Sequence, residues 1–324
     1  MADFRKISKR WCAIFGVIAL IMNTHSAQAA WLAERPLAQK IKQKFEQRTT
    51  ENMRLSSQYL QVDAMQRSYQ LYIPSSARQS ARPVVIALHG GGGNANQMLK
   101  RWQAIAQQQN FILIAPQGIG ANSKMGTWNA YGCCGQAMQK QVNDIKFIQA
   151  VLKDASQHAL LDPHRIYVVG FSNGGMLTHQ LAIQMGRQLA AVAIVSGALF
   201  GDEATAKDAV PILMIHGKKD SVVPFQGGLS PTRFVAKAQQ QPFQSVAYAM
   251  NYWKTVNQCQ TKGFIEQTVH FRIEKNLNCK ADVVLYDIDQ GQHVWPTADQ
   301  ADEGFDATVN GILKLTPFTL QMAK

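Results

Sequence analysis

Short apolar runs recur along most of this chain, and most of them are separated by stretches long enough for a helix. The runs are residues 84–88, 111–115, 166–170, 191–195, 212–215 and 283–288. The intervening stretches predict helices over 96–109, 142–158 and 173–186. Apolar strands that alternate with helices are typical of a mostly parallel sheet with helices on both faces. The sequence therefore predicts an α/β fold, whose ligands bind at the carboxyl ends of the strands.

The N-terminal segment differs from the rest of the chain. Four basic residues precede an apolar run at 11–22, and the small residues Ala27 and Ala29 follow it. This order is typical of a secretory signal peptide over residues 1–29, although a retained N-terminal anchor is the alternative. The run is short for a membrane span, so we expect no stable membrane insertion after cleavage and a secreted or periplasmic protein. Residues 30–58 are expected to form a lead-in, followed by one domain over 59–324.

Charge and cysteine content narrow the possible partners. Removing residues 1–29 takes away four basic side chains and Asp3, which lowers the formal net charge from +12 to +9. The remaining Lys and Arg residues are scattered, which indicates a solvated surface, so we expect no nucleic-acid partner. We also expect a monomer. No cysteine spacing resembles a zinc site, and the sequence predicts no metal and no cofactor.

The four cysteines that follow the signal segment meet oxidising conditions in an exported protein. We expect a disulfide between Cys259 and Cys279, because a hairpin-like segment at 264–273 can bring them together. Closing a loop of about twenty residues would stabilise the fold by about 3 kcal/mol. For the adjacent Cys133 and Cys134, a vicinal disulfide, two thiols or a bridge elsewhere all remain open.

A serine between glycines follows the third predicted strand, in the segment "GFSNG" at 170–174. Serine is a good helix N-cap, and Ser172 could simply begin the helix that follows. In the order strand, Gly-x-Ser-x-Gly, helix, the same pattern predicts a nucleophile elbow, in which a strained serine projects its hydroxyl.

A glycine-rich loop, "HGGGG" at 89–93, directly follows the first apolar run. Such a loop can turn backbone N–H groups toward a ligand, so Gly91 and Gly92 are candidate oxyanion donors together with the N–H of Asn173. A flexible or phosphate-cradling loop is the alternative, but no Gly-Lys-Ser/Thr follows the glycines. We expect His89 to brace the loop and not to transfer protons.

Two more polar residues follow later strands. Asp220 lies a few residues past the run at 212–215, where it is either a turn residue or the acid of a catalytic triad. His293 follows the last strand in a glycine-containing loop, as a general base does. Serine, acid and histidine thus occur in hydrolase order, each at a carboxyl end. This order predicts that Ser172 attacks an ester carbonyl, with His293 as base and Asp220 orienting it.

Several segments also resemble a known family. They are "RPVVIALHGGGGNANQM", "WNAYGCCG", "LDPHRIYVVGFSNGGM", "ILMIHGKKDSVVPFQGG" and "GQHVWP". They are similar to the exported polyhydroxybutyrate depolymerases and feruloyl esterases, a family that also holds acetylxylan esterases. The resemblance spans about residues 60–297, and it implies an α/β-hydrolase fold with Ser172, Asp220 and His293 as the triad. The family often has two acids where this chain has Asn143 and Asp144, so the first position departs from the pattern.

Aromatic residues near these motifs suggest where an acyl group binds. Trp128 and Tyr131 lie in the loop 122–137, and Trp295 is two residues from His293. These rings either line a substrate pocket or only pin their loops. We expect a serine esterase acting on hydroxybutyrate oligomers or polyhydroxybutyrate. The alternative is a feruloyl or acetylxylan esterase on plant polysaccharide fragments; a second is a non-catalytic binding protein with a hydrolase-like fold.

Two finer points concern the reaction and the form of the substrate. An acyltransferase also remains open, because an alcohol can release an acyl-enzyme in place of water. About thirty residues follow His293, enough for a closing helix at 299–315 and too few for a polymer-binding module, so soluble esters are favoured over crystalline polymer.

Overall fold

One ten-stranded sheet organises the computed structural model, which describes residues 55–75, 80–122, 124–260, 263–267, 269 and 271–295. The expected signal peptide, most of the expected lead-in and the expected helix at 299–315 lie outside the described residues. The chain divides into two compact units, residues 1–53 and 54–324, and every described residue belongs to the second.

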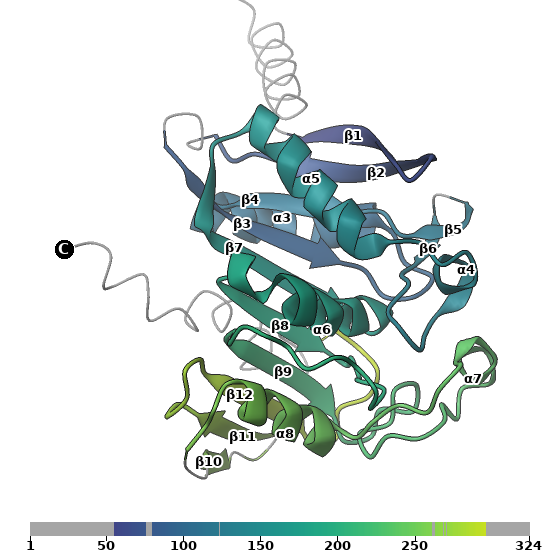
Figure 1. Cartoon of the computed structure of the whole chain (residues 1–324), viewed down its shortest axis with the longest axis vertical. Helices are drawn as coiled ribbons and strands as arrows, with labels where there is room; N and C mark the ends of the chain where they lie inside the picture. The colour runs from purple at the N-terminus through teal and green to yellow at the C-terminus, as the bar shows by residue number, and fades with distance from the viewer. Residues whose placement is uncertain are drawn as a thin grey trace, which may run out of the picture. The chain divides into compact units, whose positions relative to one another are not determined.

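The strand order is β1-β2-β4-β3-β7-β8-β9-β12-β11-β10. The strands are β1 (Leu55–Val62), β2 (Met65–Tyr72), β3 (Arg82–Leu88), β4 (Ile112–Pro116), β7 (Leu161–Phe171), β8 (Ala191–Val195), β9 (Ile212–Gly217), β10 (Phe264–Gln267), β11 (Phe271–Asn276) and β12 (Val283–Ile288). The six from β4 to β12 are parallel, and antiparallel pairs extend the sheet at both edges. Figure 1 shows this sheet running through the molecule.

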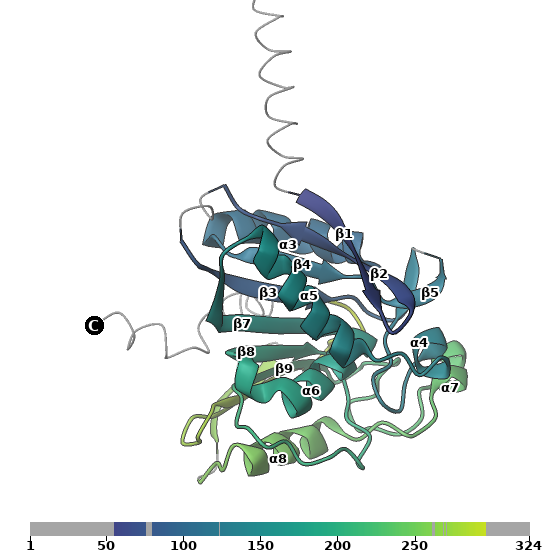
Figure 2. The same cartoon turned by 45° about the horizontal axis from the view of Figure 1, so that its top comes forward.

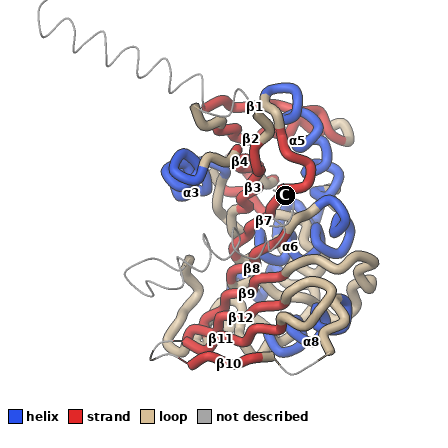
Figure 3. The backbone as a smooth tube through the Cα atoms, turned by 90° about the vertical axis from the view of Figure 1, so that its left-hand side faces the viewer, coloured by secondary structure: helices blue, strands red, loops and turns tan. Residues whose placement is uncertain are grey.

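The parallel strands are buried because helices cover both faces. Every residue of β4, β8 and β9 is buried, which explains why their sequences lack polar alternation. Helix α3 (Ala95–Gln109) covers one face, and α5 (Asp144–His158), α6 (Asn173–Met185) and α8 (Val246–Val256) cover the other, as Figure 3 shows. Each fully buried Val, Leu or Ile side chain contributes about 1.5–3 kcal/mol relative to exposure. The expected α/β architecture is confirmed.

The hairpins and short helices were less accessible to sequence reasoning. The sequence pattern predicts strands at 59–65 and 68–73, joined by a short polar turn. In the structure the turn is at Asp63 and Ala64, both at positive φ, so the first strand begins four and ends three residues earlier than expected, and the second begins three and ends one earlier. The expected hairpin at 264–273 is β10 and β11. A small ribbon of β5 (Ile119–Asn122) and β6 (Met125–Thr127), and the short helices α4 (Gly135–Gln139) and α7 (Arg233–Ala238), were not anticipated.

Long loops follow the parallel strands at their carboxyl ends. In Figure 2, α4 and α7 lie together on that side of the sheet, in the loops that follow β6 and β9. None of the helices within the described ranges is long and apolar enough to cross a membrane. The loops after β7, β9 and β12 carry Ser172, Asp220 and His293.

Candidate active site

Ser172 lies between β7 and α6 in a strained backbone conformation, with φ 54° and ψ −122°. It occupies the N-cap position, but its side chain makes no capping hydrogen bond. Its Oγ instead donates to Nε2 of His293 at 2.9 Å. Of the two interpretations of Ser172, helix N-cap or nucleophile elbow, the structure favours the elbow, because the hydroxyl faces His293 in another loop and not its own helix.

Two glycines allow this turn to pack so closely. A Cβ on Gly170 would be 2.1 Å from the carbonyl oxygen of Gly174, and a Cβ on Gly174 would be 2.4 Å from the carbonyl oxygen of His89. Only hydrogen fits at these two positions without moving backbone. The Gly-x-Ser-x-Gly spacing is therefore explained by contact between β7, α6 and the loop after β3.

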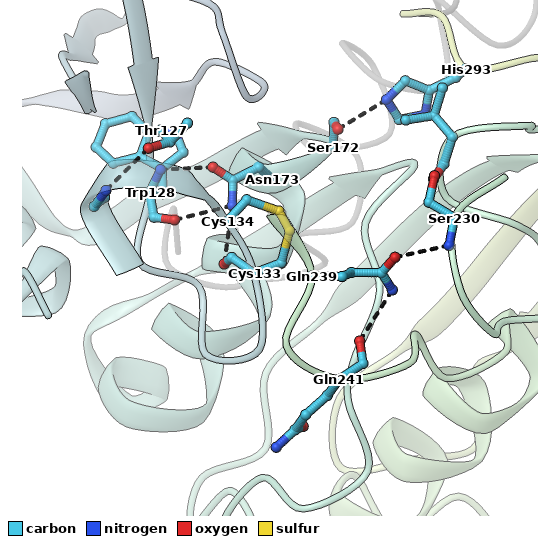
Figure 4. Close-up of a disulfide and its surroundings, with 12 residues drawn as sticks. Thr127, Trp128, Cys133, Cys134, Ser172, Asn173, Ser230, Gln239, Gln241 and His293 are labelled. Carbon is cyan, nitrogen blue, oxygen red and sulfur yellow. Dashed lines mark hydrogen bonds between the residues drawn. A yellow bond between two sulfur atoms is a disulfide. The ribbon is translucent and has the colours of Figure 1, made fainter. Parts of the chain in front are cut away.

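The acid and the histidine come from the loops after β9 and β12. The His293 Nδ1–H donates to Oδ2 of Asp220 at 2.8 Å. Because a carboxylate only accepts, Nδ1 carries the ring proton and Nε2 is left to accept from Ser172. The two loops approach through glycines: a Cβ on Gly217 would lie 2.3 Å from the backbone of Gly291. Figure 4 shows the Ser172 and His293 side chains pointing toward each other.

Asp220 is held as an anion by its surroundings. Burial raises the pKa of its carboxyl, but the hydrogen bond from His293 and the backbone N–H of Val223 outweigh burial and lower the pKa overall. Its Oδ1 accepts from the N–H groups of Val222 and Val223 at 2.9 and 2.8 Å. His216 lies 3.5 Å from Oδ2 and donates to the carbonyl of Val223 at 2.8 Å. Asp220 is thus an ionised acceptor aimed at His293.

The three expected oxyanion donors do not behave alike. The N–H of Gly92 donates to the carbonyl of Gly126 at 2.8 Å, so it is already paired and, contrary to expectation, is not available to an oxyanion. Within the described residues, neither the N–H of Gly91 nor the N–H of Asn173 has a protein acceptor. A Cβ built on Gly91 would lie 3.6 Å from the Asn173 Cβ, so the two backbones are neighbours. Together they are the two donors that can face one developing charge.

His89 braces the glycine loop, as expected. Its Nδ1–H donates to the carbonyl of Gly90 at 2.8 Å, and its Nε2 accepts from the N–H of Gly118 at 3.0 Å. Burial lowers the pKa of His89 to about 4, so the ring is neutral at pH 7. Both ring nitrogens are occupied, and none is free for proton transfer.

The sequence model of the phospholipase/carboxylesterase family matches residues 72–266. The chain belongs to that family. The expected α/β-hydrolase fold is confirmed, and the family's description agrees with the expected class of carboxylic ester hydrolase.

Two curated relatives of this chain carry more specific names than the family does. A feruloyl esterase B of Piromyces equi is 29% identical over 209 residues, covering 63% of this chain and 37% of the relative. A bifunctional acetylxylan esterase/xylanase of Neocallimastix patriciarum is 28% identical over 162 residues, covering 49% of this chain and 22% of the relative. The chain thus spans less than half the length of these two relatives.

Among solved structures, an acetyl xylan esterase from Aspergillus awamori superimposes with a TM-score of 0.56 at 14% identity. The superposition covers 79% of this chain and 99% of that one. At this identity the likeness concerns the fold, which it shares with the family.

Two of the three expected pocket aromatics are buried. Trp128 is 0% exposed, and its Nε1–H donates to the carbonyl of His89 at 2.8 Å. Trp295 is 6% exposed and packs against Phe171, with ring centroids 5.9 Å apart. In this structure neither ring lines an open surface, which agrees with the alternative that these rings pin their loops; contact of either ring with substrate stays a prediction. Tyr131 is 42% exposed and remains available to a ligand.

Sequence reasoning missed Phe171 and the role of the Asn173 side chain, although it had selected the Asn173 backbone N–H. The Phe171 ring packs against the His293 ring, with ring centroids 4.9 Å apart. The Asn173 side chain accepts from the N–H of Trp128 at 2.7 Å and donates to the carbonyl of Cys133 at 3.3 Å, which ties the loop to the nucleophile (Figure 4). Their positions beside Ser172 in "GFSNG" were a signal for both.

The Asn143–Asp144 pair, where the chain departs from its resemblance, has a structural role. Asn143 accepts from the N–H of Lys146 at 2.9 Å and caps α5. Asp144 is buried, binds Nη2 of Arg67 at 2.6 Å and accepts from the N–H of Asn129 at 2.8 Å. Burial raises the pKa of Asp144, and Arg67 opposes this effect. The pair anchors the loop after Trp128 and does not contact Ser172.

Both cysteine pairs are bonded. Cys259 and Cys279 form the expected disulfide, with Cα atoms 4.0 Å apart, and link the end of α8 to the segment before β12. Cys133 and Cys134 form a vicinal disulfide, one of the possibilities that the sequence left open (Figure 4). This second pair lies in the loop that Asn173 holds.

Proposed function

We propose that this chain is a serine esterase that hydrolyses carboxylic esters through an acyl-enzyme. The observation that carries this proposal is the continuous hydrogen-bonded line from Ser172 through His293 to Asp220. The unpaired N–H groups of Gly91 and Asn173 beside Ser172 support it. A binding protein without turnover would have no use for this arrangement.

In the proposed reaction each of these residues has one role. Ser172 Oγ attacks the ester carbonyl carbon, and Nε2 of His293 takes its proton. The Asp220 carboxylate stabilises the resulting imidazolium, and the N–H groups of Gly91 and Asn173 bind the negatively charged carbonyl oxygen. His293 then protonates the departing alkoxide. In the second half, His293 activates a water that releases the acid and restores Ser172.

For the substrate, we place feruloyl or acetyl esters of plant polysaccharide fragments first. The names of the relatives from Piromyces equi and Neocallimastix patriciarum support this choice. Hydroxybutyrate oligomers and polyhydroxybutyrate, which the sequence alone favoured, have no such support among these relatives. We further propose that the protein acts outside the cytoplasm after removal of residues 1–29, because its paired cysteines suit an oxidising compartment.

The test is a comparison of the Ser172→Ala variant with the wild type on p-nitrophenyl acetate and methyl ferulate. We expect kcat to fall by at least about 10⁴-fold, because the nucleophile is lost. Ser221→Ala, at an exposed serine next to Asp220, is the matched control and should keep full activity. A fluorophosphonate should label the wild type stoichiometrically at Ser172. Activity in Ser172→Ala equal to that of the control would refute the proposal, and ester transfer to added glycerol would identify an acyltransferase.

A further inference from the structure

Tyr131 is presented to solvent by a tight turn. The N–H of Ala130 donates to the carbonyl of Cys133 at 3.0 Å, and Tyr131 between them has φ 73°. The Tyr131 ring is exposed along one side and packs on the other against Phe200, with ring centroids 6.2 Å apart. Its hydroxyl donates to the carbonyl of Asp202 at 3.1 Å. The ring is therefore an exposed aromatic surface with a fixed orientation.

Next to this ring, the loop after β8 presents a carboxylate. Asp202 is exposed, and its Oδ2 accepts from the side-chain amide of Gln241 at 3.1 Å. The loop is stiffened by Glu203, whose Oε2 accepts from the N–H of Gly201 at 2.8 Å, and by Tyr248, whose hydroxyl donates to the Gly201 carbonyl at 3.3 Å. A ring, a carboxylate and an amide are thus held side by side before any ligand arrives.

Hydrogen bonds connect this group to the candidate active site. The carbonyl of Cys133 accepts from the side chain of Asn173, the residue after Ser172. The carbonyl of Gly132 accepts from the N–H of Gln240 at 3.0 Å, which fixes the neighbouring Gln241 against the same turn. In Figure 4, the Cys133–Cys134 pair lies next to Asn173, while Gln241 is farther from Ser172. The group is therefore tied to the loop beside Ser172 without lying at the nucleophile itself.

We propose that Tyr131, Asp202 and Gln241 form a subsite for a sugar ring in the alcohol part of the ester. A pyranose has a C–H face that packs on an aromatic ring, and a rim of hydroxyl groups. Those hydroxyls can donate to the Asp202 carboxylate and can both donate to and accept from the Gln241 amide. A phosphorylated ligand is disfavoured by the negative charges of Asp202 and Glu203. An aliphatic chain would leave this carboxylate and amide without partners.

The inference rests on the proposed esterase function, and two substrates with the same acyl group test it. The measurement is kcat/KM on acetylated xylotetraose and on p-nitrophenyl acetate, for the wild type, Tyr131→Ala and Asp202→Asn. We expect both variants to lose about tenfold or more on the oligosaccharide through a higher KM, equivalent to about 1.4 kcal/mol. On p-nitrophenyl acetate they should stay within about twofold of the wild type. Tyr131→Phe keeps the ring and should retain most of the oligosaccharide activity.

Tyr59→Ala is the matched control, since Tyr59 is 66% exposed on β1 at the far edge of the sheet. It should leave both substrates unaffected. Equal losses of Tyr131→Ala on both substrates would show that the residue only supports the loop, and no loss on either would show that it contacts no ligand. Each of these two outcomes overturns the subsite.

A binding measurement separates failure of the subsite from failure of the esterase proposal. Titration calorimetry of unesterified xylotetraose into Ser172→Ala needs no turnover. Binding that is lost when Tyr131→Ala is added supports the subsite, even if the wild type hydrolyses none of the esters. Absence of binding, with ester hydrolysis intact, overturns the subsite and leaves the proposed esterase standing.

Discussion

The two carboxylate oxygens of Asp220 accept from different groups. This difference determines how an asparagine side chain would be oriented in its place. Oδ1 accepts from two backbone N–H groups, whereas Oδ2 accepts from His293. In Asp220→Asn, the amide oxygen would keep the backbone contacts, and the NH₂ group would then face Nδ1 of His293. An NH₂ group can only donate, so it would favour the tautomer with the proton on Nε2, which cannot accept from Ser172.

We therefore expect Asp220→Asn to lower kcat by about 10⁴-fold while the fold is retained. Steady-state rates on p-nitrophenyl acetate, with a circular dichroism spectrum, check this expectation. Asp289→Asn is the control, because Asp289 follows β12 and pairs with Lys218 away from Ser172. More than about a tenth of wild-type turnover in Asp220→Asn would contradict the role given to this carboxylate.

At the scale of elements, the junction of β7, α6 and the loop after β3 has no room for a side chain. In Gly174→Ala the new methyl would be 2.4 Å from the carbonyl oxygen of His89 and 2.7 Å from that of Leu88. Alanine is favoured over glycine inside a helix by about 1 kcal/mol. Overpacking against backbone, which cannot rotate away, costs more than that and outweighs the gain.

The expected result for Gly174→Ala is a loss of about 2 kcal/mol or more in the free energy of unfolding, measured by denaturant titration. Gly91→Ala is the matched control, because a Cβ there would make an ordinary contact at 3.6 Å. Its free energy of unfolding should change by less than about 1 kcal/mol. Equal stability of the two variants would show that the close approach at Gly174 is not a constraint.

For the whole molecule, buried neutral histidines make stability depend on pH. Burial lowers the pKa of His89 to about 4 and that of His179 to about 3, and it lowers the pKa of His216 as well. Between about pH 6.5 and 4 the unfolded chain binds a proton on His89 that the folded protein does not. His89 is thus fully neutral in both states above this window, and its contribution to stability is lost as the pH falls through it.

We expect the free energy of unfolding to rise with pH across this window, and His89→Gln to reduce that slope by about 1.4 kcal/mol per pH unit. Denaturant titrations at several pH values between 4 and 7 measure the slope. Trp128→Phe removes the neighbouring hydrogen bond to the His89 carbonyl but no titrating group, so it should destabilise the protein without changing the slope. If the free energy of unfolding changed with pH equally in His89→Gln and in the wild type, the pH dependence would not come from His89.

The sequence by itself determined the sheet and the chain order of the site. Apolar runs such as 191–195 report burial locally, because a strand covered on both faces needs apolar residues at every position. The positions of Ser172, Asp220 and His293 followed from the same pattern, since each comes just after such a run. The pairing of Cys259 with Cys279 was also accessible, through the hairpin between them.

Only the tertiary structure decided which polar and aromatic groups are already engaged. Gly91 and Gly92 are adjacent and chemically identical, and they differ because the N–H of Gly92 meets Gly126 from a ribbon more than thirty residues away. Trp128 and Tyr131 lie in one loop. Trp128 is buried and donates to the carbonyl of His89, whereas Tyr131 is exposed. Local sequence records how apolar a segment is, but a hydrogen bond or a ring contact between distant segments depends on how the folded loops meet in space.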